Sequence, residues 1–196
     1  FRQVARIGSS RELRGVVILA FVSFAVVIGV RGMWAGPWLM EVKQMSRVEA
    51  GNIMLILTLM LISMPMLVSL VDRRTGRTGL LLVSGHLIAG MALLALPFGR
   101  GLAPLYDLSL LVVFGVAISV QPLLFVLGRQ SVGSSDAGKA LAAVNLAFFA
   151  GAATIQALSA PVVGLTGFSG VIMFLGVLAI AGAMAFLLTA RRPPQY

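Results

Sequence analysis

One stretch of the chain decides the fold: residues 140–190, which read ALAAVNLAFFAGAATIQALSAPVVGLTGFSGVIMFLGVLAIAGAMAFLLTA. No charged residue interrupts this run. A helix needs roughly 20 apolar residues to cross a bilayer, so the run is long enough for two. Pro161 and the glycine-rich stretch 164–170 lie near its middle and predict a tight turn there. We therefore expect two transmembrane helices, about 137–163 and 170–190.

Four more apolar runs precede this one. The first is broken only by Arg31, and each is long enough for a single crossing. The expected spans are about 15–38, 48–71, 79–98 and 104–128. Together with the last two, they predict an all-α integral membrane protein with six transmembrane helices.

The overall composition points the same way. The chain has 196 residues, of which 59% are hydrophobic and only 11% are charged, whereas soluble domains carry about 25% charged residues. This excludes a soluble domain, and the abundance of apolar residues excludes intrinsic disorder. The absence of cysteine and the single histidine leave little material for a metal site or acid–base catalysis. We expect neither an enzyme nor a bound cofactor or metal.

The basic residues predict the orientation. Most of the lysines and arginines lie on one side of the membrane, in the N-terminal segment, the loops after the second and fourth spans, and the C-terminal tail. The positive-inside rule places such segments in the cytoplasm. That side has eleven basic residues: Arg2, Arg6, Arg11, Arg14, Arg73, Arg74, Arg77, Arg129, Lys139, Arg191 and Arg192. The other side has three, Lys43, Arg47 and Arg100. Both termini, 1–14 and 191–196, are therefore expected in the cytoplasm, and the net charge of +9 is read as a topology signal and not as a nucleic-acid surface.

Local signals mark where several helices begin. Ser46 with Glu49 fits a capping box at the start of the second span, and Ser9 with Glu12 fits another before the first. Pro104 suits the first turn of the fourth span.

A short basic loop carries the first family resemblance. Leu70-Val-Asp72-Arg73-Arg-Thr-Gly76-Arg77 resembles the signature loop of the major facilitator superfamily (MFS) of secondary transporters. The match departs from the signature in that Val68 replaces its first glycine and one extra residue precedes Gly76. The resemblance implies that Asp72, Arg73, Gly76 and Arg77 help latch one conformation. The alternative is a plain positive-inside loop with a turn glycine.

A second stretch, Arg31-Gly-Met-Trp34-Ala-Gly-Pro37-Trp38-Leu, is similar to a segment in the seventh helix of some bacterial members, with Arg31 in place of a glutamine. The two stretches together imply the C-terminal six-helix half of an MFS transporter, built from two inverted three-helix repeats. Segment 1–14 then corresponds to the end of the central cytoplasmic linker.

This resemblance implies a secondary active transporter that moves a small solute across the inner membrane by alternating access. Its partners are then membrane lipids, the small-molecule substrate, and either an N-terminal six-helix half or a second copy of the chain. The alternative is a half-size or non-transporting MFS-like domain that acts as a dimer or scaffold.

Polar residues within the spans are the candidate cavity residues, since such groups usually face a bundle interior or a water-filled path. Gln121 precedes Pro122, which predicts a kink. Asn145 and Gln156 share one face of their helix, roughly opposite a row of small residues at Ala143, Ala147 and Gly151 that permits close packing. The alternatives are a harmless proline bend and amides that join helices by hydrogen bonds.

Arg31 and Trp34 are expected toward the outer end of the first span. Arg31 either snorkels to the interface, where Trp34 and Trp38 form part of an aromatic belt, or lies in the cavity, where it draws an anionic substrate or pairs with the other half. His86 is expected to have a structural role, with its ring held by hydrogen bonds, and not to act as a proton site. We expect no acidic residue inside any span, which leaves proton coupling to residues outside this chain.

Overall fold

The computed structural model describes residues 2–189. This part of the chain contains helices and turns but no strand. The elements in order are α1 (Arg2–Gly8), α2 (Arg14–Ile28), η1 (Gly29–Trp34), α3 (Ala35–Pro37), η2 (Trp38–Val42), α4 (Arg47–Thr75), α5 (Thr78–Ala95), η3 (Leu96–Gly99), α6 (Pro104–Ile118), α7 (Leu123–Gln130), η4 (Ser134–Asp136) and α8 (Ala137–Thr189). The predicted tail 191–196 lies outside the described residues.

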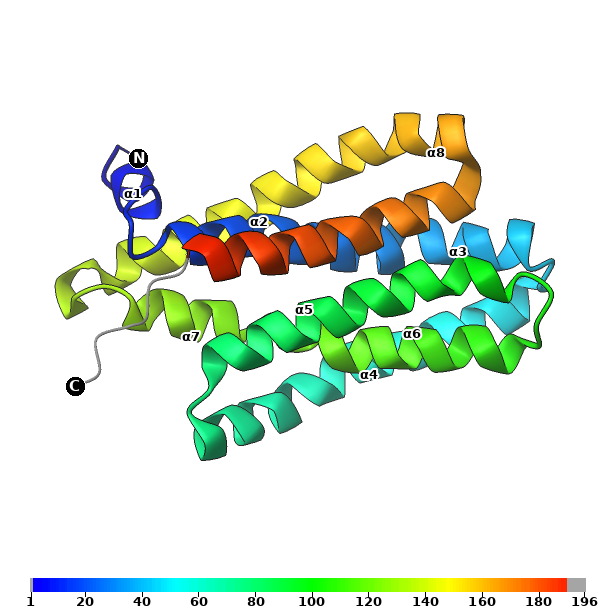
Figure 1. Cartoon of the computed structure of the whole chain (residues 1–196), viewed down its shortest axis with the longest axis horizontal. Coiled ribbons are helices and arrows are strands. Elements are labelled where there is room, and N and C mark those ends of the chain that lie inside the picture. Colours follow the sequence, from blue (N-terminus) through cyan, green and yellow to red (C-terminus); the bar gives the residue numbers. More distant parts are fainter. Residues whose placement is uncertain (1, 190–196) are drawn as a thin grey trace.

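Five helical segments are long and apolar enough to cross a membrane: Arg14–Val42, Arg47–Thr75, Thr78–Gly99, Pro104–Gln130 and Ser134–Thr189. They lie side by side along the long axis of the molecule (Figure 1). The prediction of an all-α chain with several helices able to cross a membrane is therefore confirmed for the described residues.

The longest segment, α8, doubles back on itself (Figure 1). Its backbone leaves the helical conformation at Gly167, with φ 69° and ψ −174°. A positive φ of this size is readily adopted only by glycine, which explains why the reversal occurs there. The arms before and after Gly167 extend over about 45 Å and about 33 Å at the usual helical rise. The turn predicted for 164–170 is thus present.

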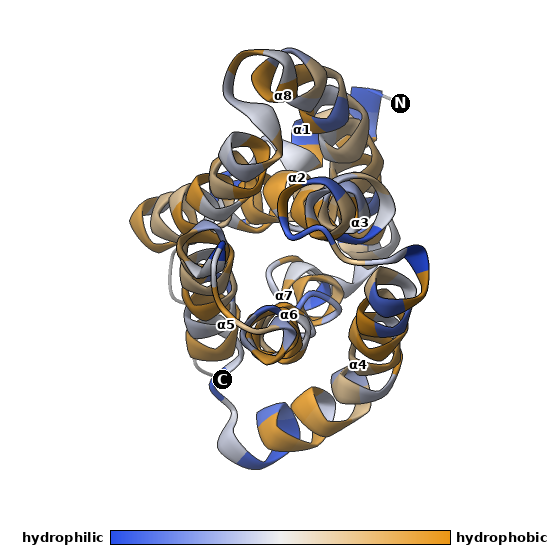
Figure 2. Ribbon diagram, turned by 90° about the vertical axis from the view of Figure 1, so that its right-hand side faces the viewer, coloured by the Kyte–Doolittle hydropathy of each residue, from blue (hydrophilic) through white to orange (hydrophobic). Residues whose placement is uncertain are grey.

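The centre of the bundle is the contact between α2 and α8. A Cβ atom added to Gly151 would lie 1.7 Å from the carbonyl oxygen of Phe21, so only glycine allows this approach. Ala143 and Ala147 are buried on the same row, as expected for close helix packing. From this centre, α8 contacts α5, α5 contacts α6, and α6 contacts α4 (Figure 2).

By contrast, α4 lies at the edge of the bundle (Figure 2). Its buried residues are Ala50, Ile53 and Leu57, all in its N-terminal half. Large apolar side chains further along are exposed, among them Ile62 at 72% and Met66 at 81%. Such a surface requires lipid or another protein against it.

The predicted helix starts have mixed outcomes. The capping box of Ser46 and Glu49 is formed at the start of α4, and Pro104 lies in the first turn of α6. The box predicted at Ser9 is wrong, because α2 is preceded by Leu13 as its N-cap, without a side-chain cap. Part of the basic segment forms its own helix, α1, and in the turn that follows it Ser10 Oγ accepts a hydrogen bond from the Leu13 amide at 3.3 Å.

Two of the five long apolar segments have an irregular helical backbone. The first passes from α2 into the π-helical turns η1 and η2, on either side of Pro37, and continues to Val42 instead of ending near residue 38. The fourth is broken between α6 and α7, where the amides of Gln121 and Leu123 bond to carbonyls only three residues back. The kink predicted at Pro122 is confirmed as a break in the helix.

Candidate functional site

A cavity of about 280 Å³ lies where these two irregular segments face α4. Twelve residues line it: Phe24, Val27, Ile28, Arg31, Thr58, Leu61, Ile62, Pro65, Ile118, Ser119, Gln121 and Pro122. The irregular backbone of η1 and of the α6–α7 break therefore borders a cavity, which is where broken helices are tolerated at membrane depth.

Arg31 supplies the only charged side chain of this lining. Its Nε donates to Thr58 Oγ1 at 3.0 Å, and the Thr58 hydroxyl donates in turn to the Met54 carbonyl at 2.8 Å. The described residues provide no carboxylate to pair with Arg31, whose side chain is exposed. The remaining guanidinium N–H groups are therefore available to another molecule.

Gln121 supplies the second polar group. Its Nε2 is buried and has no hydrogen-bond partner among the described residues. The neighbouring Ser119 hydroxyl already donates to the Gly115 carbonyl at 2.6 Å, so it can offer only an acceptor. A buried amide without a partner carries a desolvation cost, which a bound ligand or water can relieve.

Two of the five predicted cavity residues, Arg31 and Gln121, are therefore brought together. Trp34, Asn145 and Gln156 do not line this cavity. Asn145 is exposed on the first arm of α8, and Gln156 is half-buried further along the same arm. Their role in a path shared with a second protein unit stays a prediction.

The tryptophans join the first segment to α8. Trp34 Nε1 donates to Ser159 Oγ at 2.9 Å, on the arm before Gly167, and Trp38 Nε1 donates to Ser169 Oγ at 3.2 Å, on the arm after it. Trp38 is only 1% exposed. The aromatic-belt alternative is therefore wrong for Trp38, because its ring is enclosed by protein.

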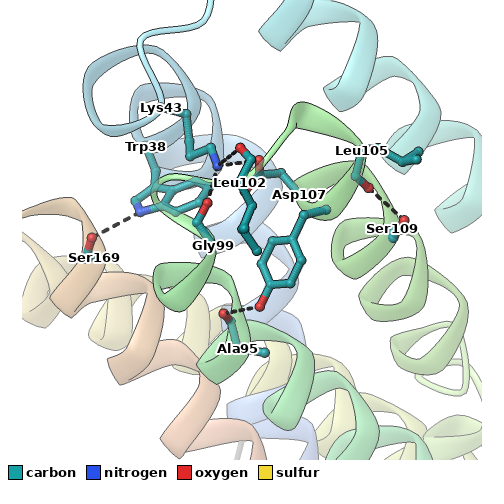
Figure 3. Close-up of polar contacts among 10 residues, drawn as sticks. Trp38, Lys43, Ala95, Gly99, Leu102, Leu105, Asp107, Ser109 and Ser169 are labelled. Carbon is teal, nitrogen blue, oxygen red and sulfur yellow. Dashed lines mark hydrogen bonds and ion pairs between the residues drawn. The ribbon is translucent and has the colours of Figure 1, made fainter.

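An ion pair between Lys43 and Asp107 closes the end of the bundle near Trp38 (Figure 3). Lys43 Nζ lies 3.0 Å from Asp107 Oδ2, and the two side chains are 3% and 0% exposed. The ammonium also donates to the carbonyls of Gly99 and Leu102, the latter at 3.0 Å. One cation thus holds the end of the first segment to the α5–α6 loop and to the first turn of α6.

This pair corrects the expectation that the spans contain no acidic residue. Asp107 lies inside Pro104–Gln130, within the predicted span 104–128. The sequence contained a signal for it, because a carboxylate in the first helical turn is stabilised by the helix dipole. Lys43 is predicted from the sequence to be a loop charge, and nothing in its spacing indicates a partner more than 60 positions away.

The loop that resembles the MFS signature is built around Asp72. Its Oδ1 accepts a hydrogen bond from the Thr78 hydroxyl at 2.7 Å, which connects the end of α4 to the start of α5. Gly76 ends α4 in the left-handed conformation, with φ 62°, and its amide donates to the Asp72 carbonyl. Arg73 and Arg77 are exposed, and the ion pairs of the described chain do not include them.

His86 is fully buried between α5 and α2. Its Nδ1 lies 2.7 Å from the Leu82 carbonyl oxygen, and its Nε2 lies 2.8 Å from Ser23 Oγ. The Nδ1 contact lies within α5, and the Nε2 contact joins α5 to α2, so both ring nitrogens have a partner, as expected for a structural histidine.

No protein-family model matches the chain, and no curated protein matches it.

Proposed function

We propose that the chain is the C-terminal six-helix half of an MFS-type secondary active transporter, which moves a small solute by alternating access. The observation that carries the proposal is the cavity between η1, α4 and the α6–α7 break. Polar groups beside discontinuous helices at a shared cavity are typical of transporter binding sites.

The proposed topology has six crossings, with the two arms of α8 crossing separately and both termini in the cytoplasm. Its support is the reversal at Gly167 and the surplus of basic residues on one side. The two inverted three-helix repeats and the location in the bacterial inner membrane follow from the family resemblance alone.

The proposed partner is a second six-helix unit, either an N-terminal half or a copy of this chain. The exposed apolar side chains of α4 and the exposed amide of Asn145 support such a partner, because hydrocarbon cannot satisfy an amide. In this arrangement the cavity opens toward the partner, and the Asp72 loop helps hold one conformation.

Accessibility from the two sides of the membrane tests the transport mechanism. Ile62 lines the cavity and is 72% exposed, so Ile62→Cys can report on it without removing a polar group. We expect a membrane-impermeant thiol reagent to modify this cysteine from either side of proteoliposomes containing the intact protein. Val177→Cys, on the second arm of α8, is the matched control at an exposed apolar position and should react from neither side. Reaction of Ile62→Cys from one side only contradicts alternating access.

Single cysteines can test the topology in the same protein, because the chain has none of its own. Gly101→Cys should react from outside intact cells, whereas Thr75→Cys and Ser134→Cys should react only after permeabilisation. The reverse pattern contradicts the orientation.

The second candidate is an MFS-like domain that scaffolds a partner without transport. The enclosed Lys43–Asp107 pair favours it, because a buried ion pair with two further carbonyl bonds resists opening at that end. One-sided labelling of Ile62→Cys, together with an intact fold, is the result this candidate predicts.

A further inference from the structure

We infer that the cavity between η1, α4 and the α6–α7 break binds a small organic anion, through Arg31 and Gln121, with an apolar body against the remaining wall. The inference rests on the proposed function, since it names the substrate class of the proposed transport site.

The charge of the cavity supports an anion. Arg31 brings one positive charge, and no acidic residue is among the twelve that line the space. Charged side chains within membrane-spanning segments usually pair with another charged group or with backbone carbonyls. Lys43, in contrast, has its counter-ion in Asp107. The described residues supply no counter-ion for Arg31, so the ligand supplies the negative charge.

The hydrogen-bonding groups support a planar acceptor such as a carboxylate. The bond from Nε to Thr58 fixes the Arg31 side chain and leaves its terminal nitrogens free to donate, and a guanidinium matches a carboxylate with two parallel bonds. The unpartnered Nε2 of Gln121, at the break between α6 and α7, adds another donor. Both groups donate, so a ligand that only accepts fits them better than one that donates.

The rest of the wall limits the ligand body. Eight of the lining residues are apolar or proline: Phe24, Val27, Ile28, Leu61, Ile62, Pro65, Ile118 and Pro122. Such a wall favours a compact hydrocarbon or aromatic group over a sugar or a multiply charged metabolite.

The test compares benzoate with benzamide, which have nearly the same shape but differ in charge. Binding is measured by calorimetry on the intact protein in lipid nanodiscs. We expect benzoate to bind at least about tenfold more tightly than benzamide, because charge-assisted bonds are the stronger ones. Equal affinities, or tighter binding of benzamide, overturn the inference.

Three variants assign the binding to this cavity. Arg31→Gln should weaken benzoate binding about tenfold or more, and Gln121→Leu should weaken it several-fold, while benzamide changes little with Arg31→Gln. Arg100→Gln, which removes an exposed arginine from the α5–α6 loop, is the matched control and should bind like the parent. Unchanged benzoate binding in Arg31→Gln, with a parental unfolding temperature, overturns the inference.

The anion-binding inference and the transport proposal can be rejected independently of each other. Charge-selective binding that needs Arg31, combined with one-sided labelling of Ile62→Cys, retains the anion site and rejects transport. Two-sided labelling without charge-selective binding retains the transporter and rejects the anion.

Discussion

Arg31 and Lys43 are two cations near the C-terminal end of the same helical segment, Arg14–Val42, and their surroundings differ. The Lys43 side chain is buried and meets a carboxylate and two backbone carbonyls, whereas Arg31 is exposed to a cavity and, among the residues that the structure describes, bonds only to the Thr58 hydroxyl. The comparison teaches that a charge in an apolar segment is not by itself a functional group. The partners around it decide whether it belongs to the fold or to a ligand site.

Loss of the ion pair should have the largest effect. Asp107→Leu leaves the Lys43 ammonium buried without its counter-ion, so we expect it to lower the free energy of unfolding by about 3–5 kcal/mol. Denaturant titration of the protein in lipid measures the change. Adding Lys43→Met should recover much of the loss, since it removes the uncompensated charge. If Asp107→Leu is as stable as the parent, Lys43 is not held as described.

A smaller effect is expected at the neighbouring tryptophan. Trp38→Phe keeps an aromatic ring but removes the donor to Ser169, which should cost about 1 kcal/mol of stability. The same titration applies, with Ser169→Ala in a double-mutant cycle. Additive losses in the cycle would mean that the two side chains do not interact.

The smallest effect on stability is expected in the loop between α4 and α5. Asp72→Asn and Thr78→Val each disturb the single bond between them, so each should cost less than about 1 kcal/mol. Their effects on any measured transport should be alike and should not add. If only Asp72→Asn lowers transport, the loop acts through its arginines instead of through Thr78.

Periodic and local signals of the sequence predicted much of the fold. The uncharged runs placed the apolar helices, Gly167 lies in the predicted turn, and Pro122 marked the helix break. Ser46 and Glu49 formed their cap because all its atoms come from one turn. The π-helical turns after Ile28 were missed, because no residue type requires them.

The site was predictable only in part, because its groups come from distant helices. Arg31 and Gln121 stand out as polar residues in apolar segments, yet their placement at one cavity depends on how η1 and the α6–α7 break lie against α4. Thr58 looked like an ordinary helix residue, and Asp107 lay at the margin of a span. Long-range pairs such as Lys43 with Asp107 have no local signature.

The same substitution at each of the two cations tests whether Lys43 belongs to the fold and Arg31 to a ligand site, because methionine removes the charge while keeping a long apolar side chain. Lys43→Met and Arg31→Met are compared for unfolding free energy and for benzoate affinity in nanodiscs. We expect Lys43→Met to lose about 3 kcal/mol or more of stability, whereas Arg31→Met stays within about 1 kcal/mol of the parent and loses benzoate binding. Equal destabilisation by the two, or undiminished benzoate binding in Arg31→Met, would contradict this expectation.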